Sequence, residues 1–212
     1  MIITGHYGSG KTNISVNIAL QAAKTGKKCT VIDLDIVNPY FRTADFEKLF
    51  NENGITLKAP MYANSNLDIP ALNISVESIL NENDCVIIDV GGDDEGAKAL
   101  GRYKGIISEC SDREMFYVVN KCRYLTKEPE EALELMREIE AASGLSCTGI
   151  INNTNLGTET NEEIINGSLD YAEKVAGAAG LPVALTAGKA EFLGENVKNP
   201  FPIEVYVKTL WN

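Results

Sequence analysis

The segment from Gly5 to Thr12 constrains the fold more than any other feature of the chain. It reads Gly-His-Tyr-Gly-Ser-Gly-Lys-Thr, so four residues separate Gly5 from the final Gly-Lys-Thr. An apolar run at residues 1–4 precedes it, and a helix-like stretch begins near Lys11. A strand, a glycine-rich loop and a helix in this order are typical of a phosphate-binding loop, because successive backbone N–H groups and the helix dipole surround an anion.

This loop predicts a site for a nucleoside triphosphate. We expect Lys11 to reach the β- and γ-phosphates and to take part in catalysis, and the Thr12 hydroxyl to ligate Mg²⁺. A glycine-rich turn without a ligand is the alternative, and the order of strand, loop and helix argues against it. The residues expected to contact the ligand are Gly5, His6, Tyr7, Gly8, Ser9, Gly10, Lys11, Thr12 and Asn13.

Charge and apolar patterning exclude several classes of partner. The net charge of −11 and the isoelectric point near 4.6 argue against a bulk electrostatic grip on nucleic acid or on an anionic membrane. Every apolar run is short, and a phosphate loop starting at residue 5 leaves no room for a signal peptide ahead of the fold. We therefore expect a cytoplasmic protein.

The cysteines show no metal or dithiol motif. Cys29, Cys85, Cys110, Cys122 and Cys147 form no C-x-C or C-x-x-C pair. Buried reduced thiols are the simplest interpretation, although Cys110 and Cys122 could still meet in space as a metal pair.

Strand-like and helix-like segments alternate along the chain. Residues 133–142 and 165–179 have apolar side chains at helical spacing, which places Met136 in the core. This alternation predicts an α/β fold with three α/β/α layers, a mostly parallel sheet of about seven strands, and the topology of a P-loop nucleoside triphosphatase. The strand-like runs are Ile2-Ile3, Cys29 to Ile32, Ile55 to Leu57, Cys85 to Ile88, Met115 to Val119, Cys147 to Ile151 and Leu181 to Leu185.

The chain length favours one domain over residues 1–212. Residues 195–212 depart from the alternating pattern, and we interpret them as a C-terminal extension that packs on the domain. Pro200 and Pro202 break any long helix there, and a short helix over 203–211 would align its apolar residues on one side.

Carboxylates follow two of the strand-like runs. Asp33 and Asp35 end one run and Asp89 ends another, so a parallel sheet delivers them to the same edge as the phosphate loop. We expect Asp33 and Asp89, with Thr12, to hold the shell of Mg²⁺. The glycines that follow, including Gly92, suit a segment whose backbone approaches a γ-phosphate closely and moves when that phosphate leaves.

These motifs together resemble the MinD/ParA/nitrogenase-iron-protein class of P-loop ATPases, the SIMIBI class with the CobQ/CobB/MinD/ParA nucleotide-binding domain. The resemblance covers roughly residues 1–185 and rests on the phosphate loop, Asp33-Leu34-Asp35, Asn38-Pro39 and residues 89–93. It implies that Asp35 orients the attacking water, with Asp93 as the alternate. Residues 38–42 and 89–92 would be mobile switches, and a nucleotide-dependent homodimer is implied.

Two departures from this class are informative. His6 occupies the position of a signature lysine that contacts phosphate across a dimer, so that lysine is absent. A protonated His6 would substitute weakly, but a histidine of ordinary pKa is neutral at pH 7. Glu95-Gly96 stands where nitrogenase-type iron proteins carry a cluster-ligating cysteine, which removes the main support for an iron–sulfur role.

The residues expected to read the base favour adenine. Asn120-Lys121-Cys122-Arg123 resembles the guanine motif Asn-Lys-x-Asp, but an arginine replaces the carboxylate that would pair with guanine. Asn152 and Asn153, after the following strand, offer amides that can pair with adenine. The sequence therefore predicts ATP and ADP as ligands in preference to GTP.

The leading hypothesis is a Mg²⁺-dependent ATPase that acts as a nucleotide-controlled conformational switch on an unidentified protein partner. Three alternatives stay open: an ATP-dependent small-molecule ligase or kinase related to dethiobiotin and cobyrinate synthetases, a metallocentre-assembly NTPase, and a nucleotide-dependent binding module without hydrolysis. Turnover of ATP alone, turnover only with a carboxylic acid, and tight binding without turnover distinguish the switch, the ligase and the binding module.

Overall fold

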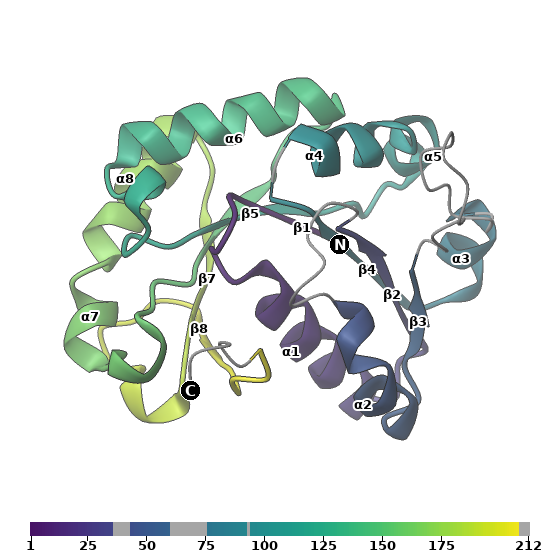
Figure 1. Ribbon diagram of the computed structural model, residues 1–212, viewed down its shortest axis with the longest axis horizontal. Helices are drawn as coiled ribbons and strands as arrows, with labels where there is room; N and C mark the ends of the chain where they lie inside the picture. Colours follow the sequence, from purple (N-terminus) through teal and green to yellow (C-terminus); the bar gives the residue numbers. More distant parts are fainter. Residues whose placement is uncertain (36–42, 60–75, 93, 208–212) are drawn as a thin grey trace.

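The computed structural model describes residues 1–35, 43–59, 76–92 and 94–207. These residues form an eight-stranded sheet in the order β3-β2-β4-β1-β5-β6-β7-β8, in which every neighbouring pair is parallel (Figure 1). The strands are β1 (Ile2–Thr4), β2 (Cys29–Leu34), β3 (Thr56–Lys58), β4 (Cys85–Val90), β5 (Met115–Val119), β6 (Gly149–Asn152), β7 (Val183–Gly188) and β8 (Pro200–Pro202).

Helices cover both faces of the sheet, with α1 and α2 on one side and α4, α6 and α8 on the other (Figure 1). Within the described ranges, no helix has both the length and the apolar character needed to cross a bilayer. The helices are α1 (Lys11–Lys24), α2 (Glu47–Glu52), α3 (Val76–Glu82), α4 (Asp94–Gly101), α5 (Lys104–Glu109), α6 (Pro129–Ser143), α7 (Glu162–Asn166) and α8 (Leu169–Ala179).

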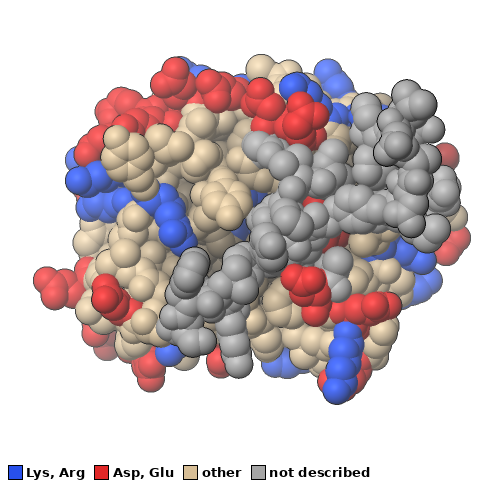
Figure 2. Space-filling view, in the orientation of Figure 1, with Lys and Arg blue, Asp and Glu red and all other residues tan. Residues whose placement is uncertain are grey.

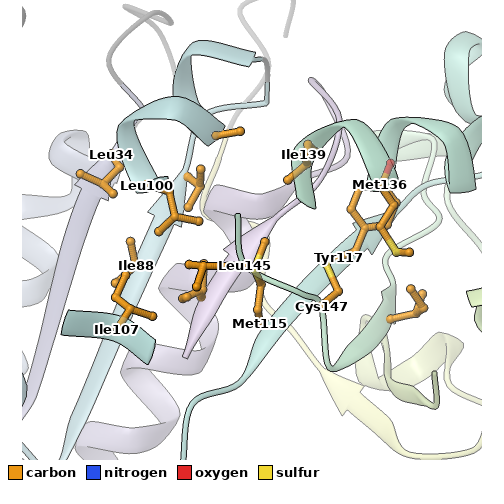
Figure 3. Close-up of a cluster of buried hydrophobic side chains, with 14 of the residues drawn as sticks. Leu34, Ile88, Leu100, Ile107, Met115, Tyr117, Met136, Ile139, Leu145 and Cys147 are labelled. Atoms are coloured by element: carbon orange, nitrogen blue, oxygen red, sulfur yellow. The ribbon is translucent and has the colours of Figure 1, made fainter. Parts of the chain in front are cut away.

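The central strands are apolar on both sides because each side meets a helical layer. In β1, Ile2 packs into the cluster under α4, α6 and α8, and its neighbour Ile3 packs into the cluster under α1. Figure 3 shows the first cluster, where Leu100 of α4 lies near Ile88 and Met136 of α6 lies beside Tyr117. Met136 is 3% exposed, so its predicted place in the core is confirmed.

The predicted fold class is confirmed, but the predicted number of strands was one too low. The eighth strand, β8, contains Pro200 and Pro202, which the sequence suggested only as helix breakers. Proline lacks a donor N–H and is tolerated in a strand at the edge of a sheet. β8 pairs with β7 alone, so it occupies such an edge.

The helical pattern at 165–179 is divided into two helices. α7 ends at Asn166, and α8 starts at Leu169 after a turn through Gly167 and Ser168. The Ser168 hydroxyl donates to the Ile165 carbonyl at 2.7 Å and accepts from Asn152, so it is occupied in the turn. By contrast, α6 follows the predicted pattern without interruption.

The C-terminal segment runs along α1 without forming the expected helix over residues 203–207, while 208–211 lie outside the described residues. Asn13, Asn17 and Gln21, one helical turn apart on α1, donate to backbone carbonyls of residues 202 and 204. Asn17 also accepts from the backbone N–H of Glu204 at 2.9 Å. These bonds satisfy an extended backbone, which explains why a helix is not needed there.

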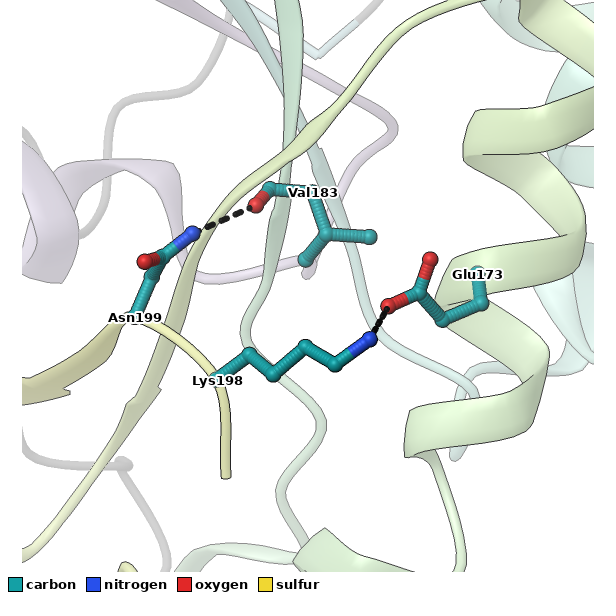
Figure 4. A network of polar contacts seen from close by, with 4 residues as sticks. All are labelled: Glu173, Val183, Lys198 and Asn199. Atoms are coloured by element: carbon teal, nitrogen blue, oxygen red, sulfur yellow. Dashed lines mark hydrogen bonds and ion pairs between the residues drawn. The ribbon is translucent and has the colours of Figure 1, made fainter. Parts of the chain in front are cut away.

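The approach to β8 is fixed by polar contacts with β7 and α8 (Figure 4). The Asn199 amide donates to the Val183 carbonyl at 3.1 Å, and Lys198 lies 3.5 Å from Glu173 of α8. The ion pair is exposed and contributes little stability. The hydrogen bond from the Asn199 side chain extends the contact between β7 and β8 by one residue beyond the start of β8.

We expect Tyr117→Phe to stabilise the protein by about 1 kcal/mol, because it removes a buried hydroxyl. Tyr117 is fully buried in β5, and its hydroxyl has no hydrogen-bond partner among the described residues. Tyr171→Phe is the matched control, since the Tyr171 hydroxyl donates to the Thr126 carbonyl and its loss should destabilise. Urea unfolding of both variants measures the difference, and equal signs would contradict this account.

Candidate phosphate-binding site

The loop between β1 and α1 has the backbone conformation that its glycines permit. Gly5, Gly8 and Gly10 all have positive φ, at 147°, 74° and 89°. A Cβ at Gly5 would lie 2.5 Å from the Val118 carbonyl oxygen, and one at Gly10 would collide with the Asn153 amide. The loop therefore needs glycine for its conformation and for the close approach of β5 and of the residue after β6.

Lys11 is held close to the loop that precedes it. Its side chain is 7% exposed, and Nζ donates to the His6 carbonyl at 3.2 Å. Partial burial, and then the Lys11 charge, lower the pKa of His6. His6 is therefore neutral at pH 7, which disfavours it as a cationic replacement for a lysine at this position.

Two buried carboxylates lie side by side beneath the loop. Asp33 of β2 and Asp89 of β4 are paired in the parallel ladder, and each is 1% exposed. Thr12 Oγ1 donates to Asp89 Oδ2 at 2.9 Å, and Ser15 Oγ donates to Asp89 Oδ1 at 3.1 Å. Asp33 Oδ1 accepts from the backbone N–H of Asp35 at 2.9 Å. The structure thus brings together Thr12, Asp33 and Asp89, the residues predicted to hold a cation.

Burial, and then the charge of the neighbouring Asp33, raise the pKa of Asp89 to about 7. Lys11 and the hydroxyl donors Thr12 and Ser15 act in the opposite direction without cancelling the effect. A cation between the two carboxylates would favour their charged forms, as charge neighbours do.

The segment after β4 packs directly on the phosphate loop. A Cβ at Gly92 would lie 2.6 Å from the Tyr7 backbone nitrogen and 2.8 Å from Lys11 Nζ. A Cβ at Gly91 would lie 3.2 Å from Asp35 Oδ1. The two glycines therefore allow a contact between this segment, the loop lysine and Asp35 that a side chain would block.

Arg123 is a loop contact that the sequence did not single out for this site. Its Nε donates to the Gly8 carbonyl at 2.7 Å, and its guanidinium lies against Gly8. It follows β5, at the position where the guanine motif would carry its carboxylate. The failed motif was the available signal, because it placed an arginine after β5, but it did not indicate the contact with Gly8.

The three asparagines predicted or considered as base contacts have structural partners. Asn152 donates to Ser168 Oγ at 2.9 Å and accepts from Thr154, and Asn153 donates to the Ser9 carbonyl at 2.8 Å. Asn120 accepts from the backbone of Cys122 and Asn155. A base contact by Asn152 or Asn153 remains a prediction and would require sharing or exchanging these bonds.

Other predicted residues lie apart from the loop or outside the described part of the chain. The Asn13 side chain contacts residues 204–207, which leaves its backbone for a ligand. Asp93 and residues 38–42 lie outside the described residues. Cys110 and Cys122 lie beyond opposite ends of β5, about 16 Å of strand apart, so they do not form a metal pair.

Comparison with known families decides the relationship. Residues 1–164 match the sequence model of the CobQ/CobB/MinD/ParA nucleotide-binding domain. The chain belongs to this family. It is therefore a nucleotide-binding P-loop NTPase, as the loop, the sheet and the buried carboxylates indicate. A comparison with the sequences of curated proteins found no significant match.

Solved structures with the same fold include signal recognition particle proteins. The cell division protein FtsY of Thermotoga maritima is 20% identical with a TM-score of 0.58, over 86% of this chain and 60% of that one. The signal recognition particle 54 kDa protein of Aeropyrum pernix, solved with GDP, is 17% identical with a TM-score of 0.57, over 90% of this chain. This chain covers only 41% of that protein. These likenesses show the fold that this family member shares with them.

We expect the free energy of unfolding of the protein without nucleotide or metal to fall as pH rises from about 4 to about 7. The ordinary pKa of the Asp89 carboxyl is 3.8 and its folded value is about 7, so between these values the folded protein keeps a proton that the unfolded chain loses. Asp89→Asn removes this linkage, and the stability gained by the variant should grow with pH over that range.

Urea unfolding between pH 4.5 and 8, with EDTA and without nucleotide, measures this difference. Asp170→Asn, which removes an exposed carboxylate on α8, is the control for a simple change of net charge. A gap between Asp89→Asn and the native protein that is constant with pH would contradict the raised pKa.

Proposed function

We propose that this protein is a Mg²⁺-dependent ATPase in which ATP binding and hydrolysis switch the conformation of the segments after β2 and β4. The observation that carries the proposal is the bond from Thr12 to Asp89, with Asp33 alongside in register. It joins the first turn of α1 to Asp89, and Asp33 lies beside that carboxylate on the neighbouring strand. A hydroxyl and buried carboxylates beside a phosphate loop are the ligands that Mg²⁺–nucleotide complexes use.

The donor set fits magnesium. The described residues contain no group of three or more His, Cys, Asp or Glu side chains that could hold a metal by themselves. Mg²⁺ keeps several waters and is usually bound through one or two carboxylates and the phosphates of the substrate. Thr12 would contact the ion, and Asp33 and Asp89 would hold its waters. When bound, Mg²⁺ neutralises charge on the phosphates.

The protein's own residues would act by positioning and charge. Backbone N–H groups from Gly8 to Thr12, with the N-terminal end of α1, would surround the β-phosphate, and Lys11 would leave the His6 carbonyl for the γ-phosphate. Asp35, at the end of β2 and near Gly91, is placed to accept a hydrogen bond from a water. Such positioning supplies most of the catalysis in phosphoryl transfer.

The contact of Gly92 with Lys11 and the loop supports the conformational part of the proposal. The backbone at Gly92 lies where a γ-phosphate bound by Lys11 would meet it. A phosphate there would order residues 91–92 through their N–H groups, and hydrolysis would release them. The segment leads directly into α4, so a shift at Gly92 would be passed to a helix that packs against α6.

ATP is proposed in preference to GTP because Arg123 replaces the carboxylate that pairs with guanine. The guanidinium contacts Gly8 and would repel rather than accept the guanine N1–H and N2–H₂ donors. The similar Aeropyrum pernix protein was solved with GDP, so GTP is the competitor that any test must include. The alternative ligase activity would need cations such as Lys121 and Arg123 to bind a carboxylate substrate, and it receives less support because both side chains donate to backbone carbonyls.

The function is tested by measuring phosphate release and nucleotide affinity with ATP and GTP side by side. We expect steady turnover of ATP with Mg²⁺ and without an added substrate. Lys11→Ala should weaken ATP affinity about 10- to 100-fold through loss of charge-assisted hydrogen bonds. Asp35→Ala should lower kcat about 100-fold with little change in affinity.

Lys48→Ala, which removes an exposed lysine of α2, is the control for Lys11→Ala. Loss of turnover in Asp93→Ala but not in Asp35→Ala would transfer the water-positioning role to Asp93. Turnover only in the presence of a carboxylic acid would indicate a ligase, and unchanged ATP affinity in Lys11→Ala would refute the site.

A nucleotide-dependent homodimer belongs to the same proposal. Large apolar side chains are exposed in the loops that follow β1, β5 and β6, at the sheet edge that carries the phosphate loop: Tyr7, Tyr124, Leu125 and Leu156. Acidic side chains gather along the margin over α6 in Figure 2, away from much of the uncharged surface on this face. An apolar rim around a ligand site suits a contact that forms when the ligand is bound.

We expect Asp35→Ala to double in mass by light scattering when ATP and Mg²⁺ are added. Addition of Tyr124→Ser should prevent this, because the Tyr124 side chain is 89% exposed at the rim. Val205→Ser, which changes an exposed apolar residue on the C-terminal segment, is the matched control. A monomer in every nucleotide state would exclude the dimer while leaving the ATPase proposal intact.

A further inference from the structure

Two cysteines lie side by side where β2 and β4 begin, at the opposite ends of these strands from the phosphate loop. Cys29 opens β2, Cys85 opens β4, and the two are paired in the parallel ladder. Paired strand residues point to the same face with backbones about 4.8 Å apart. Disulfide-bonded cysteines have Cα atoms about 4.4–6.8 Å apart. Both side chains pack in the apolar cluster under α1, so the two thiols share one face of the sheet and an S–S bond can form with little movement of the strands.

A cavity is bordered by one of the two cysteines, Cys85, which is half-buried. It has a volume of about 260 Å³, and Cys85 and Cys110 line it together with the cationic side chains of Lys27 and Arg113. Cys29 is 1% exposed and does not line the cavity. A small reagent entering from solvent therefore meets Cys85 before Cys29.

The surroundings of the pair give the two thiols different roles. The neighbouring Cys29 lowers the pKa of Cys85 against the effect of burial, and the Met1 amino group and Lys27 act in the same direction as Cys29. The neighbouring Cys85, with burial, raises the pKa of Cys29. Because Cys85 borders the cavity and Cys29 is buried, Cys85 is the nucleophile of the pair and Cys29 is its resolving partner.

The other cysteines lack this arrangement. Cys147 is buried, and burial raises its pKa; burial also raises that of Cys122. Cys110 shares the cavity, but its Sγ contacts the Ile106 carbonyl at 3.8 Å within its own helix. None of Cys110, Cys122 and Cys147 is paired with another cysteine in the strand ladders of the described residues.

We propose that Cys85 and Cys29 are a modification site for hydroperoxides and form a reversible disulfide between β2 and β4. The Cys85 thiolate attacks one peroxide oxygen, the O–O bond breaks, and with one proton taken up the products are the Cys85 sulfenic acid and an alcohol, or water from hydrogen peroxide. The Cys29 sulfur then attacks Cys85, the S–O bond breaks, and the Cys29 proton leaves with the hydroxyl as water. Overall, two thiols are oxidised and one hydroperoxide is reduced.

This disulfide would join the two strands whose other ends carry Asp33 and Asp89. It lies four residues along each strand from those carboxylates, about 13 Å away. The pair is therefore separate from the nucleotide site, and its chemistry does not depend on the proposed ATPase activity.

The test treats the purified full-length protein with one equivalent of hydrogen peroxide, alkylates the remaining thiols, and maps the peptides by mass spectrometry. We expect loss of two hydrogen atoms from the intact mass and one cross-linked peptide containing Cys29 and Cys85, which dithiothreitol removes. In Cys29→Ala, the reaction should stop at a Cys85 sulfenic acid that dimedone traps. In Cys85→Ser, Cys29 should stay reduced.

Cys110→Ser, in the same cavity, and Cys147→Ser, in the core, are the matched controls and should retain the cross-link. The peptide map of the native protein needs no variant, so a folding defect in Cys29→Ala would not prevent the test. A cross-link from Cys85 to Cys110, or oxidation that does not favour Cys85 over the other cysteines, would overturn the proposal.

Discussion

The in-register pairing of β2 and β4 places two buried carboxylates side by side, and the rest of the site is arranged around them. Asp33 and Asp89 would repel each other if both were charged in the dry interior. Two hydroxyls and a lysine offset part of this cost, and the pKa of Asp89 stays raised. The repulsion between Asp33 and Asp89 is thus unfavourable in the protein without a ligand. A bound cation would relieve it, and this relief would favour the liganded state.

The phosphate loop is fixed from several directions at once. β5 approaches Gly5, the Asn153 amide binds the Ser9 carbonyl, and Arg123 binds the Gly8 carbonyl. These contacts hold the Gly8 and Ser9 carbonyls in place, so the loop has its conformation without a bound anion. Such preorganisation lowers the entropy lost on binding, and it depends on residues far from the loop in sequence.

Local patterns predicted the parts of the structure that local chemistry determines. The phosphate loop, the strands and the placing of Asp33 and Asp89 near Thr12 follow from residue order and from the geometry of a parallel sheet. Contacts between distant segments could not be predicted in this way. Nothing adjacent to Arg123 indicates that it meets Gly8, and nothing near Pro200 indicates that β7 leaves an edge free. The contact of the Asn13 side chain with Tyr206 could not be predicted either, because that backbone is remote in sequence.

The asparagines of α1 bind a part of the backbone that is synthesised much later than the helix. Asn13 and Asn17 are buried, and their partner Glu204 lies 191 and 187 positions further along the chain. During translation α1 therefore emerges long before the backbone that satisfies it, and for that interval its amides must be hydrated. The helix that begins with Lys11 and Thr12 becomes fully packed only when residues 200–207 dock, so maturation of the ligand site is coupled to completion of the sheet.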